Sequence, residues 1–341
     1  MAGHSCDISS STISRRRLLT IGAGAAGGFA GAAIAGCTMP GGGLGGPTFQ
    51  SGPNARGGFQ NFEGATFSSD LQHQIESIIN AKGTVTNGAL QIQIDRNDIR
   101  NVELRGVPIL PSFEINGQLN FQSLGGTRVL MNSDLCLERE EIDPFIDQLL
   151  RHNIIFQAEH QHFYDFVPIV FFIHFRALGD AITIARGVKA ALNVTSTPFP
   201  QAPPKHPHTP LPVAEIGKII GVTPTVGANG VVSLQVPRAD TIMLGGQPAN
   251  PYLNIMTPID FEPLGDGRAA AVPDFGMIAS EIQRVVARMR GFGWDIGCLY
   301  NQETAEEPQL FFSHQFKVGN PIQLAHEIRA GLELMDVKLG G

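Results

Sequence analysis

The chain carries one sequence pattern twice, and this repeat constrains the fold more than any other feature. Residues 119–192 align without a gap with residues 259–332, at a separation of 140 positions. Upstream of this segment the separation becomes 142. The matched pairs include Phe172 and Phe312, His174 and His314, Asp134 and Asp274, Arg96 and Arg238, and Asp98 and Asp240. Such a long repeat predicts two tandem copies of one structural unit.

Each copy contains two amphipathic helical patterns. The first covers residues 142–150, and a second helix is predicted to begin after Asp180, a residue type that caps helix N-termini. Asn320 followed by Pro321 occupies the same position in the second copy. The expected core face of the first helix is Ile142, Phe145, Ile146, Leu149 and Leu150.

Strands are predicted at about residues 154–162 and 169–176, and shorter ones at 90–94 and 115–121. Only about six residues join the first two strands, so we expect an antiparallel hairpin, because a parallel crossover needs a dozen residues or more. Each copy is therefore expected to be an α+β unit, an antiparallel sheet with helices packed on one face. The two copies are expected to be related by a pseudo-twofold axis.

Composition and linker sequences define the domains. Copy one is assigned to residues 67–197, a Pro-rich linker to 198–212 and copy two to 213–337. Hydrophobic residues make up 43% of the chain, which is enough for two packed cores. The net charge of −7 argues against an electrostatic nucleic-acid binder, so no nucleic-acid partner is expected.

The N-terminal residues 1–36 resemble an export signal. Arg15 and Arg16 fit a twin-arginine pattern, and a weakly apolar run leads to Cys37 in a lipobox-like context. In this interpretation Cys37 is acylated, as with palmitate, and residues 37–66 form a Gly-rich tether. The expected location is the cell envelope, with the lipid anchor as the membrane contact. A plain signal cleaved nearby and an uncleaved anchor are the alternatives.

Several motifs in order resemble the LppY/LpqO family of bacterial lipoproteins. They are a His-x-His element, a proline, an aromatic-x-His strand and a Gly-Asp-Ala helix start, and the resemblance covers about residues 70–335 as two copies. It implies an envelope lipoprotein built on a domain of unknown function, and it implies no mechanism. Copy two departs from the pattern, because Tyr300 and Gln302 replace His160 and His162.

His160 and His162 are the principal candidate site. They are two apart on a predicted strand, so both project from one face, together with the apolar Ile154, Phe156 and Ala158. Two neutral imidazoles at this spacing can bind a divalent transition metal such as Zn²⁺, which would need one or two further ligands. Core histidines with internal hydrogen bonds and an acid–base pair without metal are the alternatives.

Four other residues are weaker candidates. Pairing residue 156 with residue 174 would place His174 about 13 Å along the sheet from His160, at about 3.3 Å per residue, so His174 is expected to be structural. Asp165 in the turn is expected near the rim of the site. Arg96 and Asp98 share a strand face, and they form either a structural ion pair or a site for an anionic or sugar-like ligand.

The sequence favours a membrane-anchored binding protein whose small ligand or metal, or an envelope component, binds near His160 and His162 or between the copies. A cell-envelope hydrolase that uses the same histidines is the alternative, and a scaffold lipoprotein without a small-molecule site is the third. Whether the protein is an enzyme stays open. Cys136 and Cys298 are either a disulfide or two separate thiols.

Overall fold

The structure is a computed structural model that describes residues 65–201 and 208–340 of the chain. Each copy forms a six-stranded antiparallel sheet, and the strand order is the same in both. Sheet one runs β1 (Thr84–Thr86), β2 (Ala89–Asp95), β5 (Asn116–Ser123), β6 (Arg128–Leu137), β9 (Phe171–Asp180) and β7 (Ile155–His160). Sheet two runs β10 (Thr225–Val226), β11 (Val232–Val236), β14 (Thr257–Gly265), β15 (Arg268–Met277), β18 (Phe311–Gly319) and β16 (Asp295–Ile296). The predicted α+β class with two tandem copies is confirmed.

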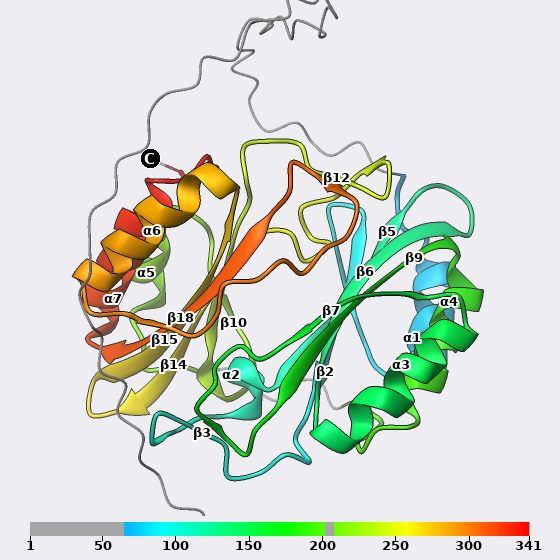
Figure 1. The fold of residues 1–341 in the computed structure, drawn as a ribbon, viewed down its shortest axis with the longest axis horizontal. Helices are drawn as coiled ribbons and strands as arrows, with labels where there is room; N and C mark the ends of the chain where they lie inside the picture. The colour runs from blue at the N-terminus through cyan, green and yellow to red at the C-terminus, as the bar shows by residue number, and fades with distance from the viewer. Residues whose placement is uncertain (1–64, 202–207, 341) are drawn as a thin grey trace, which may run out of the picture. The chain divides into compact units, whose positions relative to one another are not determined.

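Helices cover one face of each sheet (Figure 1). Copy one contributes α1 (Ser69–Ile79), α3 (Ile142–Arg151) and α4 (Ala181–Leu192), and copy two contributes α5 (Val213–Ile220), α6 (Ala279–Gly291) and α7 (Pro321–Leu332). The expected caps are confirmed, because Asp180 accepts a hydrogen bond from Thr183 N and Asn320 accepts from Ile322 N. Helices α1 and α5 lie outside the two amphipathic patterns seen in the sequence. Among the described residues, no helix has the length and hydrophobicity that crossing a membrane requires.

Short elements extend the loops of each copy. Copy one has α2 (Pro111–Glu114), the turn η1 (Arg139–Glu141) and a small sheet of β4 (Val107–Pro108), β3 (Glu103–Leu104) and β8 (Phe166–Val167). Copy two has η2 (Ala228–Gly230) and the small sheet β13 (Gln247–Pro248), β12 (Met243–Leu244) and β17 (Glu306–Glu307). Both small sheets lie near contacts with the other copy, because Arg105 between β3 and β4 pairs with Asp295, and the backbone oxygen of Pro248 in β13 accepts from Gln122 Nε2.

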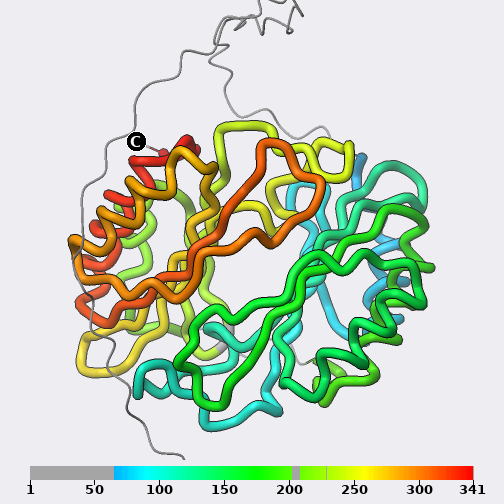
Figure 2. The backbone as a smooth tube through the Cα atoms, viewed as in Figure 1, coloured from blue at the N-terminus to red at the C-terminus, as the bar shows by residue number. Residues whose placement is uncertain are grey.

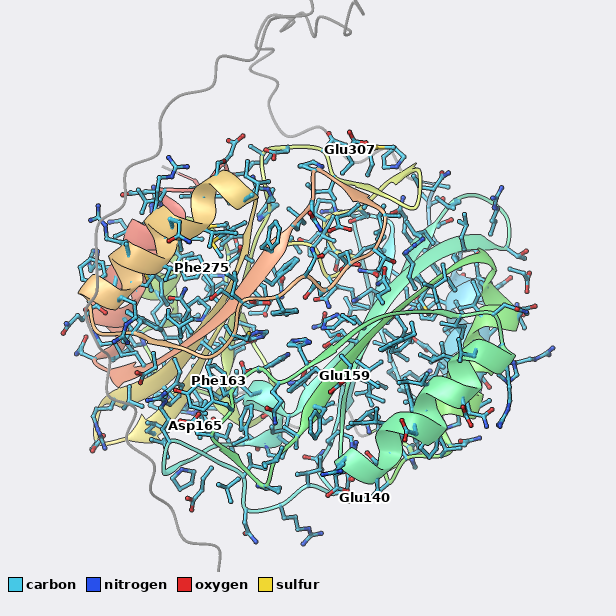
Figure 3. All side chains as sticks on the ribbon, viewed as in Figure 1. Glu140, Glu159, Phe163, Asp165, Phe275 and Glu307 are labelled. Carbon is cyan, nitrogen blue, oxygen red and sulfur yellow. The ribbon has the colours of Figure 1, made fainter. Side chains whose placement is uncertain are left out.

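The face of each sheet that the helices leave uncovered is directed at the other copy (Figure 2). A buried hydrophobic cluster contains Phe163 and Phe172 of copy one together with Val272 and Phe316 of copy two. By contrast, Phe275 belongs to the core between sheet two and its helices. Figure 3 labels Phe163 and Phe275 and shows how side chains fill both kinds of layer. The two copies are therefore joined through a buried apolar interface.

Reciprocal contacts show the pseudo-twofold relation of the copies. The backbone N–H of Leu110 donates to the carboxylate of Glu262, at 3.1 and 3.2 Å. At the matching positions, Asn250 N–H donates to Oε1 of Gln122 at 2.8 Å. Leu110 corresponds to Asn250 and Glu262 corresponds to Gln122, so exchanging the copies turns one contact into the other, as a twofold interface requires.

Two local expectations were wrong. Leu150 is 62% exposed, so it is not part of the core face of α3, and its counterpart Arg290 is polar. The connection between β7 and β9 spans residues 161–170 rather than about six residues, because it contains β8. β8 pairs with β3, which keeps it out of the hairpin.

Candidate functional site

The strand β7 presents its histidine to the second copy because of an irregularity in its pairing with β9. Phe156 pairs with Phe175, but after a bulge Ala158 pairs with His174 and His160 pairs with Phe172. Phe172 lies in the cluster between the copies, whereas Phe175 lies in the core under the helices. His160 therefore faces copy two. Phe156 lies on the other face of the strand, although the sequence pattern predicted that it shares the face of His160. The bulge is the reason, since one extra residue moves a side chain to the other face.

His174 lies beside His160, which corrects the expected separation of about 13 Å. The centroids of the two rings are 5.0 Å apart, and the rings are stacked. The expected register assumed a short turn without a bulge. In the observed register His174 is a diagonal neighbour of His160, and such neighbours are within reach of aromatic side chains.

Three imidazoles from both copies form a candidate metal-binding group. His160, His162 and His314 each offer one ring nitrogen, and these nitrogens all lie within 4.8 Å of one another. His162 follows the end of β7, and its ring stacks on that of His314 with centroids 3.6 Å apart. His314 comes from β18 of copy two. Copy two thus contributes a side chain to the group although it lacks the His-x-His element.

Carboxyl groups lie beside two of the three rings, and one of them, Glu114, is within hydrogen-bond distance of its ring. Nδ1 of His162 lies 3.2 Å from Oε2 of Glu114, which is at the end of α2. Nδ1 of His314 lies 3.5 Å from Oδ1 of Asp274 and 3.3 Å from Sγ of Cys298. A carboxyl oxygen that holds Nδ1 leaves Nε2 free for a metal, which is the usual outer-shell arrangement of metal-binding histidines.

His160 carries the third ring, and none of the described residues gives it a hydrogen-bond partner. Both ring nitrogens of His160 are buried without a hydrogen bond, and so is Nε2 of His174. The ring of His160 stacks on Tyr300, with centroids 3.6 Å apart. An unpaired buried polar group costs roughly 1–3 kcal/mol, so these orphaned nitrogens are an unusual feature that a bound cation would explain.

Burial sets the protonation of the group. It lowers the pKa of His160, His162 and His314 well below the ordinary value for histidine, and the neighbouring imidazoles lower the pKa values further. Burial alone lowers the pKa of His174 to about 3. All four rings are therefore neutral near pH 7, which is the form that coordinates metals.

Buried carboxyl groups surround the imidazoles. Burial raises the pKa of Asp134 to about 7 and that of Asp274 to about 8. Burial raises the pKa of Glu114 well above its ordinary value, and the charges of Asp260 and Asp274 raise it further. Their raised pKa values keep much of this group of acids protonated near pH 7, and a bound cation would favour their ionised form.

The pseudo-twofold relation defines a second, equivalent place at the interface. There Tyr300, Gln302 and His174 stand where His160, His162 and His314 stand in the first. The hydroxyl of Tyr300 donates to Oε1 of Gln302 at 2.9 Å, and Gln302 Nε2 donates to the backbone oxygen of Asn254. A phenol and an amide do not replace two imidazoles as ligands of a transition metal. The two places are thus equivalent in fold and different in chemistry.

One protein family accounts for both copies. The sequence profile described as Domain of Unknown Function (DUF1259) matches residues 73–194 and again residues 214–334. The chain belongs to this family. Neither the curated proteins nor the solved structures gave a match. The DUF1259 match therefore supports the tandem architecture, and the candidate site lies where the two DUF1259 copies meet.

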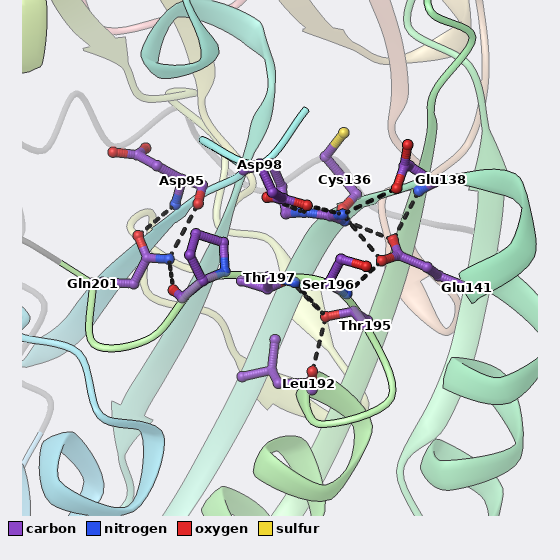
Figure 4. Close-up of polar contacts among 12 residues, drawn as sticks. Asp95, Asp98, Cys136, Glu138, Glu141, Leu192, Thr195, Ser196, Thr197 and Gln201 are labelled. Carbon is purple, nitrogen blue, oxygen red and sulfur yellow. Dashed lines mark hydrogen bonds and ion pairs between the residues drawn. The ribbon is translucent and has the colours of Figure 1, made fainter. Parts of the chain in front are cut away.

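Arg96 and Asp98 belong to a structural cluster in the first DUF1259 copy (Figure 4). Arg96 is fully buried, and it donates to Asp98, to Glu141 and to the backbone oxygen of Cys136. Glu141 also accepts from Glu138 N at the start of η1 and from Ser196 N. The second copy repeats this cluster with Arg238, Asp240, Glu281 and the backbone oxygen of Gly276. The guanidinium is occupied by internal partners, so the ion-pair interpretation is the one the contacts support.

Asp165 and Cys136 lie outside the histidine group, whereas Cys298 contacts His314. Asp165 forms an ion pair of 3.0 Å with Arg105, which also pairs with Asp295 of the second DUF1259 copy at 3.1 Å. Cys136 and Cys298 are free thiols. Cys37, Arg15 and Arg16 are outside the described residues, so lipidation and export stay predictions.

Sequence reasoning missed four residues of the site. Glu114, Asp274, Cys298 and Tyr300 contact the imidazoles but belong to no linear motif with them. One signal was available, because Asp134 and Asp274 recur at matching positions, as do His174 and His314. In both copies this aspartate pairs across the sheet with this histidine.

Proposed function

We propose that this DUF1259 protein is an envelope lipoprotein that binds one divalent transition metal between its two copies. His160 and His162 of copy one and His314 of copy two would be the ligands, and zinc is the ion that this donor set fits most readily. The observation that carries the proposal is the convergence of three imidazole nitrogens within 4.8 Å, with carboxylates behind two of the rings.

The donor set suits such an ion in charge and in size. Tetrahedral zinc with bonds of about 2.0–2.1 Å separates its nitrogen ligands by about 3.4 Å. The three nitrogens would close by roughly an ångström on binding, which side-chain rotation can supply. Neutral imidazole also binds copper, nickel and iron, so affinity alone does not select zinc.

A metal-dependent hydrolase of the cell envelope is the second candidate. The observation that favours it is the donor count, because three protein ligands leave a fourth position for water, as in catalytic zinc sites. Hydrolysis of model esters, phosphoesters or glycosides by the zinc-loaded protein, and its loss in His162→Ala, would support this candidate. A zinc-loaded protein that hydrolyses none of these substrates would favour binding alone.

Export and anchoring form the other part of the proposal. The order of Arg15, Arg16, an apolar run and Cys37 supports a twin-arginine lipoprotein signal, in line with the resemblance to the LppY/LpqO lipoproteins. A lipid chain on Cys37 would make the membrane its first partner, with the metal or an envelope component as the second. The twin-arginine route carries folded proteins, which would allow a metal to be loaded before export.

Metal analysis of the purified protein tests the site. After dialysis against zinc, we expect one zinc per chain, and we expect His160→Ala, His162→Ala or His314→Ala to weaken binding by more than about 100-fold. The loss in His314→Ala is the sharpest expectation, since this histidine belongs to the copy without the His-x-His element.

The pseudo-twofold relation provides matched controls. His174→Gln alters the counterpart of His314, and Tyr300→Phe alters the counterpart of His160, so both variants should retain zinc. Circular dichroism on the same samples would show that each variant is folded. Failure of the parent protein to retain any of zinc, copper, nickel, cobalt or iron would contradict the proposed function.

A further inference from the structure

Two equivalent junctions hold the copies together at the ends of β7 and β16. Junction A is formed where residues 300–304 of copy two contact copy one. Junction B is formed where residues 160–164 of copy one contact copy two. Because the pseudo-twofold relation exchanges the junctions, each one serves as an internal reference for the other.

Junction A is closed by a buried hydrogen-bond network. Glu303 of copy two accepts from Asn132 Nδ2 at 2.7 Å and from Gln157 Nε2 at 3.0 Å. Gln157 Oε1 in turn accepts from Thr304 N at 3.1 Å, and Arg176 Nη2 donates to Thr304 O at 3.3 Å. Glu303 is only 3% exposed, so water does not compete for these bonds. This network links copy one to the loop of copy two directly.

Junction B has no equivalent network at the matching positions. Asn132, Gln157, Glu303, Thr304 and Arg176 are matched there by Val272, Gly297, Phe163, Tyr164 and Phe316. The ion pair of Arg105 with Asp295 crosses this junction, but both side chains are about one third exposed, at 31% and 35%. Such pairs contribute little, on the order of 0–1 kcal/mol.

What junction B has instead is the group of imidazoles. His160 and His162 come from copy one and His314 comes from copy two, so any ion bound to all three joins the copies. The ring nitrogens of His160 make no hydrogen bond with the described residues, unlike the polar atoms of Glu303 in junction A. Apart from the partly exposed ion pair of Arg105 with Asp295, the described residues of junction B therefore lack the polar link that junction A makes with buried side chains.

We infer that the metal acts as a clasp, the counterpart of the Glu303 network. This inference rests on the proposed metal site and adds a regulatory consequence to it. Metal binding locks residues 160–170 of copy one onto β18 of copy two, and metal loss frees that loop while junction A stays closed. By linkage, whatever separates the loop from copy two lowers metal affinity by the same factor.

Hydrogen exchange on the full chain tests the clasp. With zinc present, amides of residues 160–170 should exchange at least 10-fold more slowly than with a chelator, whereas amides of residues 300–307 should change by less than 2-fold. His314→Gln, a change in copy two, should abolish the zinc effect on the loop of copy one. Amides of α6 serve as a folding check, because that helix belongs to the core of copy two.

A second variant separates the two junctions. Glu303→Ala should speed exchange in residues 300–307 and leave the zinc effect on residues 160–170 intact. Zinc content measured on the same samples separates the two ideas. Absence of zinc would overturn both the metal site and the clasp. One zinc per chain with unchanged exchange in residues 160–170, or a zinc effect that persists in His314→Gln, would overturn the clasp alone.

Discussion

Glu262 and Gln122 occupy equivalent positions, and each accepts one backbone N–H across the interface. The difference between them is charge. Burial raises the pKa of Glu262 to about 7, against the opposing effect of the Leu110 N–H. A carboxyl group whose pKa is higher in the folded than in the unfolded chain contributes stability at low pH. That contribution is lost as pH rises through the folded value.

Replacement of Glu262 by glutamine should remove this pH dependence while keeping the hydrogen bond. At pH 8 we expect the free energy of unfolding of Glu262→Gln, measured by denaturant titration, to exceed that of the parent by on the order of 1–3 kcal/mol. Near pH 4.5 the two free energies should differ little. The reverse change, Gln122→Glu, should destabilise the protein at pH 8 and not near pH 4.5. Equal differences at both pH values would contradict this account.

Glu114 holds His162 through Nδ1, and its role in metal binding can be tested by a change that preserves its shape. Glu114→Gln keeps an oxygen near the ring but removes the carboxylate, so the orientation and basicity of His162 are less favourable. We expect zinc affinity, measured by competition with a chelator, to fall about 10–100-fold. Unchanged affinity would show that Glu114 does not support the ligand.

At the scale of elements, α3 shows where the hydrophobic pattern alone overstates burial. Leu149 is fully buried, whereas Leu150 is 62% exposed. The core face of this helix is narrower than the sequence suggests, because Leu150 is rotated by about 100° around the helix axis from the buried Leu149. The matching residues in α6 are Met289, which is buried, and the polar Arg290. The polar residue Arg290 in α6 therefore indicates that this position is exposed, which the hydrophobic pattern of α3 alone does not.

Two substitutions in α3 test this difference. Leu149→Ala should lower the free energy of unfolding by about 2–5 kcal/mol, since it leaves a cavity in a packed core. Leu150→Arg, which copies the residue found in α6, should change it by less than about 0.5 kcal/mol. Urea denaturation measures both, and a large loss in Leu150→Arg would contradict the exposure of Leu150.

At the scale of the whole molecule, the two copies depend on each other. The candidate site takes two ligands from copy one and one from copy two, so neither copy holds it alone. Copy two would therefore contribute a ligand to the site although it lacks the His-x-His element. The functional asymmetry remains, because the equivalent place with Tyr300, Gln302 and His174 lacks the donor set.

The proposed membrane attachment concerns the entire chain and depends on Cys37. Cys37→Ser should remove the acylation site, so the protein should appear in the soluble fraction or accumulate as an unprocessed precursor. Fractionation and mass spectrometry of the exported protein measure this. An unchanged mass together with unchanged membrane association would contradict lipidation at this residue.

The sequence by itself determined the repeat, the α+β class and the caps at Asp180 and Asn320, and it offered an ion pair of Arg96 with Asp98 as one of two interpretations. These features depend on local periodicity or on neighbours two residues apart, and duplication displayed them twice. The sequence also identified His160 and His162 as unusual, because two histidines on one strand face need partners.

Only the tertiary structure decided which residues complete the site. A bulge in β7 shifted its register against β9 and brought His174 beside His160, and no residue type in the strand specifies that shift. The pseudo-twofold interface then brought His314 from about 150 positions away in the chain to His160 and His162. Distances across an interface depend on how two sheets pack, and that packing is fixed by many apolar contacts together rather than by any one motif.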